Sequence, residues 1–213
     1  MTSPLPPGSP AAHPAHFPET RSALRKRLRA QRRALSPVQQ HAAAGGLADL
    51  LGHSGLFRRS RHIAFYVATD GELDPAPLMR RAWALGKVCY LPVITPDRRL
   101  WFAPYAQDDE LTTNRYGIPE PAAPALASAR HLDLILAPLV GFDERGHRLG
   151  MGGGFYDRTL AFLHHRRAWR KPRLIGIAHD LQRVARLESA PWDVPMDAVA
   201  TDSALYLFSN NRA

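Results

Sequence analysis

The chain has 213 residues, of which 45% are hydrophobic and 22% charged, values that suit one globular domain able to bury its own core. No apolar run approaches the roughly 18 residues of a membrane span, and a single cysteine, Cys89, excludes an intrachain disulfide framework. The formal net charge of +9 favours anionic ligands, such as phosphates, polyanionic small molecules or nucleic acid, without choosing among them.

Residues 1–18 are rich in proline, which disfavours both a helix and a central strand. The prolines are Pro4, Pro6, Pro7, Pro10, Pro14 and Pro18. This composition predicts a disordered tail, followed by one folded domain over residues 19–209. The tail also lacks the charged start and apolar core of a secretory signal, so we expect a cytoplasmic location.

Two helices are predicted after the tail. The segment 21–34 combines leucines at roughly helical spacing with many arginines. Ser36 is a good N-cap and Pro37 a good first residue for a second helix, which should reach about Leu51. Four basic residues of the first helix are expected to form a solvated face: Lys26, Arg27, Arg32 and Arg33.

Five apolar runs then follow without the alternation of half-exposed strands. They cover residues 63–68, 88–94, 134–140, 174–178 and 205–208. Such runs predict strands buried on both faces, as in a parallel sheet. Helical stretches near 76–85 and 156–165 separate them, and residues 100–105 are predicted to form an edge strand. The pattern predicts a single α/β domain with a mainly parallel central sheet flanked by helices.

The segment 146–158, GHRLGMGGGFYDR, follows a predicted buried strand and opens a predicted helix. Glycines let the backbone approach a ligand closely, and successive amides at a helix start attract an anion. Arg148 and Arg158 flank the loop and can pair with phosphate oxygens. We therefore predict a glycine-rich phosphate loop between a strand and a helix, with a flexible turn as the alternative. Its spacing matches neither the P-loop nor G-x-G-x-x-G.

The string RLGMGGGFYDR at 148–158 closely resembles the signature of 5-formyltetrahydrofolate cyclo-ligases, also called 5,10-methenyltetrahydrofolate synthetases. Other segments resemble family motifs in the same order: RSALR at 21–25, DGELD at 70–74, YGIPEP at 116–121, PLVGFD at 138–143 and WDVPMD at 192–197. Two positions depart from the family pattern. Arg21 stands where a lysine usually meets the ATP phosphates, and Trp192 stands where many members have histidine. Arginine keeps the charge but differs in reach and shape.

The resemblance implies ATP-dependent cyclisation of 5-formyltetrahydrofolate to 5,10-methenyltetrahydrofolate, with release of ADP and phosphate and with Mg²⁺ as cofactor. It implies that Arg148 is catalytic, as a charge clamp on the transferring phosphoryl group. The implied ATP-binding residues are Arg21, Arg25, Arg148, Leu149, Gly150, Met151, Gly152, Gly153, Gly154, Phe155, Tyr156 and Asp157.

The resemblance also implies folate contacts at Glu72, Tyr116 and Tyr156, and metal contacts at Asp157 and Asp193. Each has a plainer alternative: a solvated loop acid for Glu72, core packing for the tyrosines and a helix-start acid for Asp157. Asp193 cannot be separated from Asp197 by spacing alone, because either suits a metal contact, a cap or a surface position. The ten histidines show no zinc-binding spacing.

The expected partners are ATP and 5-formyltetrahydrofolate, including polyglutamylated forms, with no nucleic acid and no membrane. The expected state is a monomer. Three alternatives stay open: a sugar-phosphate isomerase or transferase on a related fold, a basic nucleic-acid-binding protein, and a folate-binding or regulatory protein without turnover. The charge favours the second, and Arg21 in place of lysine favours the third.

Deletion of residues 1–18 should leave enzymatic turnover intact, because a disordered proline-rich tail contributes no packed surface to the domain. The measurement compares the specific activity of the truncated and full-length proteins. A large loss of turnover on truncation would contradict the prediction.

Overall fold

The structure, a computed structural model, describes residues 19–122, 125–165 and 171–208, so the tail predicted over 1–18 lies outside the described residues. Helix α1 (Arg21–Arg33) begins after Thr20, whose hydroxyl accepts a hydrogen bond from the Ala23 amide. Helix α2 (Pro37–His53) begins with a capping box, in which Ser36 and Gln39 each bind the other's backbone amide. The predicted starts of both helices are confirmed, and α2 runs slightly beyond the expected end.

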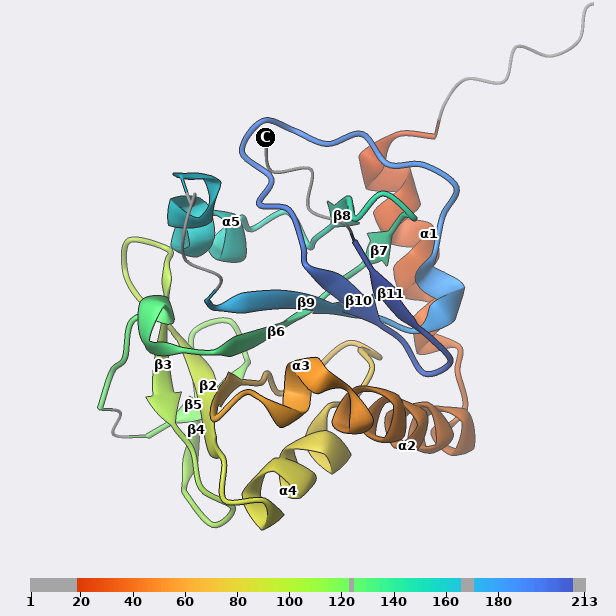
Figure 1. Cartoon of the computed structure of the whole chain (residues 1–213). Helices are drawn as coiled ribbons and strands as arrows, with labels where there is room; N and C mark the ends of the chain where they lie inside the picture. The colour runs from red at the N-terminus through yellow and green to blue at the C-terminus, as the bar shows by residue number, and fades with distance from the viewer. Residues whose placement is uncertain (1–18, 123–124, 166–170, 209–213) are drawn as a thin grey trace, which may run out of the picture.

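The central sheet has the strand order β11-β10-β9-β6-β1-β2-β3 (Figure 1). Its strands are β1 (His62–Ala64), β2 (Val88–Ile94), β3 (Leu100–Pro104), β6 (Leu134–Pro138), β9 (Arg173–Ile177), β10 (Ala198–Ala200) and β11 (Leu205–Leu207). The five strands from β10 to β2 run parallel, while β3 and β11 pair antiparallel at the two edges. The predicted mainly parallel sheet and the edge strand at 100–105 are therefore confirmed.

Three details of the sheet differ from expectation. Strand β1 is shorter than the run 63–68, because the chain leaves the sheet after Ala64. Strand β10 was not predicted, since three residues make too short an apolar run to stand out. The prediction that 205–208 is buried on both faces was wrong, because β11 lies at the edge of the sheet and its Leu207 is 67% exposed. The Thr201 amide donates to the Ala204 carbonyl and closes a tight turn after β10. Because this connection is so short, β11 can only pair antiparallel with β10.

Helices cover both faces of the sheet, which explains the unbroken apolar runs (Figure 1). On one face, Ile63, Leu134 and Ile175 pack against α2, α3 (Gly55–Arg58) and α4 (Ala76–Ala84). On the other face, Ile135 and Leu174 pack against α5 (Phe155–Leu160) and the 3-10 turn Ala161–His165. The helix expected over 156–165 is thus an α-helix that tightens into 3-10 geometry.

The direction of winding reverses between β1 and β6. Strand β2 follows β1 on one side, whereas β6, β9 and β10 are added on the other side. Two small ribbons lie outside the main sheet: β4 (Leu111–Thr113) with β5 (Pro119–Pro121), and β7 (Gly141–Phe142) with β8 (Arg148–Leu149). Ligands of open α/β sheets bind beyond the carboxyl ends of the strands at such a reversal. The loops after β1 and β6 are therefore the segments to search for a site.

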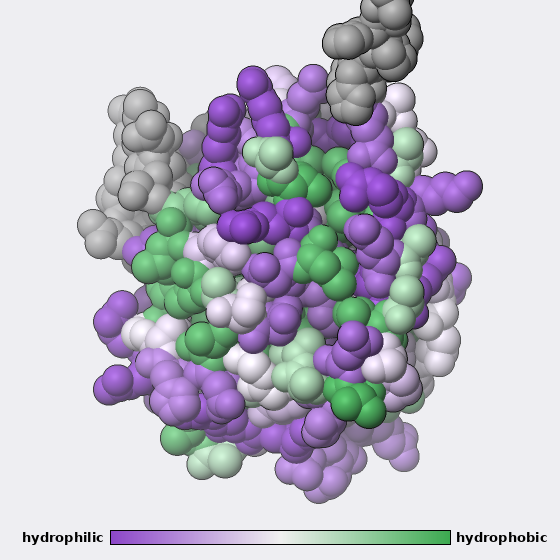
Figure 2. Space-filling view, turned by 90° about the vertical axis from the view of Figure 1, so that its right-hand side faces the viewer, coloured by the Kyte–Doolittle hydropathy of each residue, from purple (hydrophilic) through white to green (hydrophobic). Residues whose placement is uncertain are grey.

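The face that carries α1 and α2 is largely hydrophilic, with apolar side chains scattered among polar ones (Figure 2). No helix among the described residues combines the length and apolarity needed to cross a membrane.

Leu24 and Leu28 bury one side of α1 against Val140, Leu149 and Leu187, so this helix is fixed to the loops beyond the sheet.

Substitution of Gly46 by alanine should destabilise the fold by about 1–3 kcal/mol, because the new methyl group would overpack α2 against its neighbour. A Cβ at Gly46 would lie 2.3 Å from the carbonyl oxygen of Asp202. The matched control is Gly45→Ala in the same helix, where nothing lies within 4 Å. That variant should gain about 0.5–1 kcal/mol from helix propensity. Urea unfolding measures both, and equal effects at the two positions would contradict the packing described.

Candidate active site

The glycine-rich segment begins in the small ribbon rather than directly after a strand of the main sheet. Arg148 and Leu149 form β8, and α5 begins at Phe155 after Gly154, which has a φ of 65°. Gly152 has a φ of 95°, a backbone conformation that side chains rarely allow. Asp157 lies in the first turn of α5. The glycines therefore make the sharp change of direction between ribbon and helix, which exposes Met151 and leaves the loop amides near the surface.

Arg148 is buried, and its guanidinium group donates to the carbonyl of Val194 and to Oδ1 of Asp157. The Val194 amide donates to the same carboxylate oxygen at 3.3 Å. Burial lowers the pKa of Arg148, and the charges of Asp157 and Asp193 oppose that shift. The fold thus places two carboxylates around one desolvated arginine.

The N-terminal half of α1 reaches the same loop. Arg25 donates from Nε to the Gly150 carbonyl at 2.8 Å. Arg21 donates to the Glu188 carbonyl at 2.7 Å, and its Nη1 lies 3.8 Å from Oδ2 of Asp193. The sequence-predicted residues of the phosphate site are therefore brought together from α1, the ribbon, α5 and the segment before β10.

Asp193 and Asp197, which spacing could not separate, have different surroundings. Asp193 accepts from the Ala190 amide at 2.9 Å and faces Arg21. Asp197 is buried, and accepts from Arg173 at 2.6 Å and from the Leu174 amide at 2.8 Å. The second aspartate therefore links β9 to the start of β10.

Glu72 lies in the loop after β1 with only 10% of its side chain exposed, so the alternative of a solvated loop acid was wrong. Its Oε2 accepts from the amide of Thr69 at 3.1 Å, and its Oε1 lies 3.6 Å from Nη2 of Arg32. Burial raises the pKa of Glu72, while Thr69 and Arg32 oppose the shift. Burial also raises the pKa of the Tyr156 hydroxyl, with nearby Glu72 adding to the effect. The loop after β1 and helix α5 thus converge.

Arg32 corrects the prediction of a solvated basic face on α1. It has no exposed surface, whereas Lys26, Arg27 and Arg33 are exposed as expected. The signal was present in the spacing, because Arg32 continues the buried row of Leu24 and Leu28 at intervals of four. Arginine is rarely fully buried, so its residue type predicts exposure even in a row of buried positions.

Tyr116 is 48% exposed, so the alternative of a core tyrosine was wrong for this position. Its ring meets that of Phe155 edge-on, with 5.8 Å between centroids. Arg158 is exposed to solvent. It folds back to donate to the Gly153 carbonyl and, at 3.1 Å, to the Arg98 carbonyl. Trp192 is 70% exposed. Tyr156 is partly buried, so both interpretations of that residue remain.

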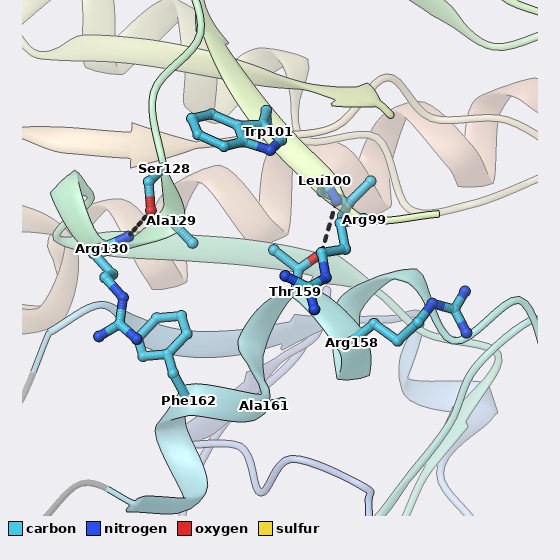
Figure 3. A pocket seen from close by; sticks show the side chains of 10 residues that line it. All are labelled: Arg99, Leu100, Trp101, Ser128, Ala129, Arg130, Arg158, Thr159, Ala161 and Phe162. Carbon is cyan, nitrogen blue, oxygen red and sulfur yellow. Dashed lines mark hydrogen bonds between the residues drawn. The ribbon is translucent and has the colours of Figure 1, made fainter. Parts of the chain in front are cut away.

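A cavity of about 310 Å³ lies between β3 and α5 (Figure 3). Its lining includes Trp101, Arg130, Arg158 and Phe162. The Thr159 hydroxyl accepts a hydrogen bond from the Leu100 amide at 2.7 Å, which joins α5 to β3. Of the residues predicted to contact ATP, folate or metal, only Arg158, at the end of the glycine-rich segment, lines this cavity. We therefore locate the candidate site by the convergence of its side chains and not by this hollow.

Among the described residues, no group of three or more His, Cys, Asp or Glu side chains could hold a metal ion by itself. Two carboxylates, Asp157 and Asp193, flank Arg148. Mg²⁺ is usually bound by one or two carboxylates together with substrate phosphates and water. The donor set therefore fits Mg²⁺ delivered with a nucleotide better than a metal held by protein alone.

A model of the 5-formyltetrahydrofolate cyclo-ligase family matches residues 18–202. The chain belongs to this family. It is 40% identical over 183 residues to the 5-formyltetrahydrofolate cyclo-ligase of Escherichia coli, spanning 84% of this chain and 98% of the relative. Identity to the Haemophilus influenzae cyclo-ligase is 35% over 184 residues, spanning 84% and 95%.

The NMR structure of the Aquifex aeolicus 5,10-methenyltetrahydrofolate synthetase matches this cyclo-ligase family member with a TM-score of 0.77. The two sequences are 28% identical, and the match covers 91% of this chain and 95% of the other. Neither the sugar-phosphate enzyme nor the nucleic-acid-binding protein is favoured by these relatives.

Replacement of Asp70 by asparagine should remove part of the acid sensitivity of the fold. Partial burial alone would raise the pKa of Asp70, but hydrogen bonds from Arg29, Arg33 and Arg32 lower it to about 2. Because the pKa in the folded state lies below the unfolded value, this stabilisation is full above about pH 4 and is lost as the pH falls toward 2. Asparagine tolerates the left-handed backbone of this residue, whose φ is 55°.

Urea midpoints at pH 2–7 test this expectation. The wild type should lose stability steeply between about pH 4 and pH 2, whereas Asp70→Asn should be weaker at pH 7 and change less over that window. Asp108→Asn, on the exposed turn after β3, is the control and should follow the wild type. Parallel curves for the wild type and Asp70→Asn would contradict the assignment.

Proposed function

We propose that the protein catalyses the ATP-dependent cyclisation of 5-formyltetrahydrofolate to 5,10-methenyltetrahydrofolate, with release of ADP and phosphate. The observation that carries this proposal is the convergence of two clusters of low exposure at the reversal of the sheet. One cluster is Arg148 with Asp157, and the other is Glu72 with Tyr156. Membership of the cyclo-ligase family supports the same assignment.

The nucleotide side of the proposed site is the loop 150–154 with its surrounding charges. The loop amides would bind phosphate oxygens, and Arg148 would clamp the transferring group with a guanidinium whose direction Val194 fixes. Arg25 would hold the loop through Gly150, and Arg21 would add positive charge. Mg²⁺, held by Asp157 and Asp193 together with phosphates, would neutralise charge on the phosphoryl oxygens.

The residues proposed to bind the folate are Glu72, Tyr116 and Tyr156. Glu72 is a hydrogen-bond acceptor with little exposure, suited to the amino and ring N–H donors of a pterin. Tyr116 offers a half-exposed ring, and Tyr156 lies beside Glu72, so both would pack on the flat rings of the folate. We also propose a cytoplasmic monomer that accepts polyglutamylated folate and has no nucleic-acid partner.

The chemistry explains why two substrates must be held together. A formamide oxygen is a poor leaving group. The terminal phosphoryl group of ATP transfers to this oxygen, which forms one P–O bond and breaks another to release ADP. Nitrogen 10 then attacks the formyl carbon and loses its proton, and the C–O bond to phosphate breaks. The protein contributes orientation of the two substrates and neutralisation of charge on the moving phosphoryl group.

The first test is a spectrophotometric assay with 5-formyltetrahydrofolate, Mg²⁺ and ATP, which follows the near-ultraviolet absorbance of methenyltetrahydrofolate. Product should form only with ATP. Arg148→Lys should lower kcat by about a hundredfold, because a lysine cannot reproduce the fixed guanidinium fork in a desolvated site. Thermal melting checks that the variant is folded.

Arg130→Lys is the control for this assay, since Arg130 lies over the ring of Phe162 and outside the proposed site. Its kcat should equal that of the wild type. Absence of ATP-dependent product from the wild type would refute the proposed reaction, and full activity in Arg148→Lys would refute the role of that arginine.

Tyr116→Ala should raise the KM for 5-formyltetrahydrofolate roughly five- to tenfold, because an aromatic contact contributes on the order of 1 kcal/mol. Tyr116→Phe keeps the ring and should stay close to the wild type. The KM for ATP should not change in either variant. Steady-state kinetics decide the matter: equal losses in the two variants, or no loss in either, would show that the ring does not contact the folate.

A further inference from the structure

Arg32 makes an unusual set of contacts for a residue without exposed surface. Its Nε donates to the Asp70 carbonyl at 2.9 Å, and its Nη2 donates to the Asp70 carboxylate at 2.9 Å. Its Nη1 donates to the Leu139 carbonyl at 3.1 Å. Asp70 belongs to the loop after β1 and Leu139 to the loop after β6, so one guanidinium group joins the two loops that flank the reversal of the sheet.

A buried arginine is costly unless its charge and its donors are satisfied. Here the two loops supply backbone carbonyls, and Asp70 and Glu72 supply the counter-charges. The planar fork of arginine fixes the directions of these partners, which an ammonium group would not do. Because all of these partners must stay in place to satisfy the buried Arg32, the two loops are also fixed relative to each other.

The turn that precedes Glu72 needs such support. Asp70 has a φ of 55° and Gly71 a φ of 73°, so two successive residues adopt the left-handed conformation. This conformation is uncommon for a residue with a side chain and persists only where the surroundings hold it. Arg29 and Arg33 also bind the Asp70 carboxylate, and His179 lies 3.2 Å from the Gly71 carbonyl. The direction of Glu72, the next residue, depends on this turn.

The same helix also holds the nucleotide side. Arg25 lies seven residues before Arg32, which corresponds to two helical turns and about 10.5 Å along one face. Arg25 donates to the Gly150 carbonyl of the glycine-rich loop. Leu28, between the two arginines, is fully buried and anchors the helix. Helix α1 is therefore a rigid link from the glycine-rich loop to the loop that carries Glu72.

We propose that Arg32 is a positioning residue, which holds Glu72 in the orientation that binds the folate and, through α1, in a fixed place relative to the glycine-rich loop. This inference rests on the proposed role of Glu72 as the acceptor for the pterin. Arg32 itself contacts neither substrate.

The charges around Glu72 predict in which direction each substitution shifts its pKa, and this shift can be measured. The charged and titratable groups around Glu72 are Arg32 from α1, Asp70 from its own loop, and Tyr66 and Tyr156 from neighbouring segments. Arg32 lowers the pKa of Glu72, whereas Asp70 raises it. Loss of Arg32 should therefore extend protonation of Glu72 to higher pH, and loss of the Asp70 charge should restrict it to lower pH.

The test uses the full chain with Arg32→Met and Asp70→Asn, measuring KM for each substrate and the pH dependence of kcat/KM for 5-formyltetrahydrofolate. Both variants should raise the KM for 5-formyltetrahydrofolate about tenfold at pH 8, with the KM for ATP within about twofold. The acid limb of kcat/KM should move up by about one pH unit in Arg32→Met and down in Asp70→Asn. A general loosening of the fold would not produce opposite shifts.

The matched control is Asp133→Asn at the amino end of the sheet. Asp133 accepts from the His62 amide at 2.9 Å and from Lys171 at 2.5 Å, and it touches neither loop. Its loss should lower the melting temperature without changing either KM or the acid limb. If Arg32→Met does not fold, Arg32→Lys replaces it. That variant keeps the charge and should raise the KM for 5-formyltetrahydrofolate while leaving the acid limb in place.

Unchanged KM for 5-formyltetrahydrofolate in the folded Arg32 variant would overturn the inference. A parallel rise of both KM values would also overturn it, since that result indicates a purely structural role. Failure of the proposed function is a separate outcome, because it appears as a wild type without ATP-dependent product. In that case, calorimetric binding of 5-formyltetrahydrofolate to the wild type and to the Arg32 variant, without ATP, still decides whether Arg32 sets folate affinity.

Discussion

The reversal of winding between β1 and β6 is the constraint on which the rest of this structure depends. No crossover segment covers the carboxyl ends of these two neighbouring strands, so the loops that follow the strands meet at this edge of the sheet. Arg32 satisfies its buried donors by binding carbonyls in both loops, Asp70 in one and Leu139 in the other. This junction determines where Glu72 lies, how the ribbon that carries Arg148 runs and where α1 packs.

The strong positive charge of the chain has distinct structural uses along a single helix. Arg21 and Arg25 lie against the glycine-rich loop and the segment that carries Asp193. Arg32 is a buried connector, and Lys26 and Arg27 remain on the exposed face. A basic composition therefore does not require a nucleic-acid partner in this protein. Much of the charge on this helix serves to hold loops in place.

Local signals in the sequence predicted what local physics determines. The capping residue Ser36 sets the start of α2, and long apolar runs mark strands covered on both faces. The sequence could not reveal partners that only the folded chain brings together. Arg32 was misassigned because arginines are usually exposed, and Asp193 and Asp197 were inseparable because spacing does not tell which element each one faces. Strand β10 was missed because three residues carry too little pattern.

The central claim is that the formyl oxygen is phosphorylated and leaves as part of the released phosphate. The most direct measurement uses 5-formyltetrahydrofolate labelled with ¹⁸O in the formyl group, with turnover in the presence of ATP and Mg²⁺ and mass analysis of the phosphate. Phosphorylation of the formyl oxygen predicts one ¹⁸O atom in each phosphate released. Unlabelled phosphate, with the label lost to water, would mean that ATP hydrolysis and ring closure are separate events and that the formyl oxygen is not phosphorylated.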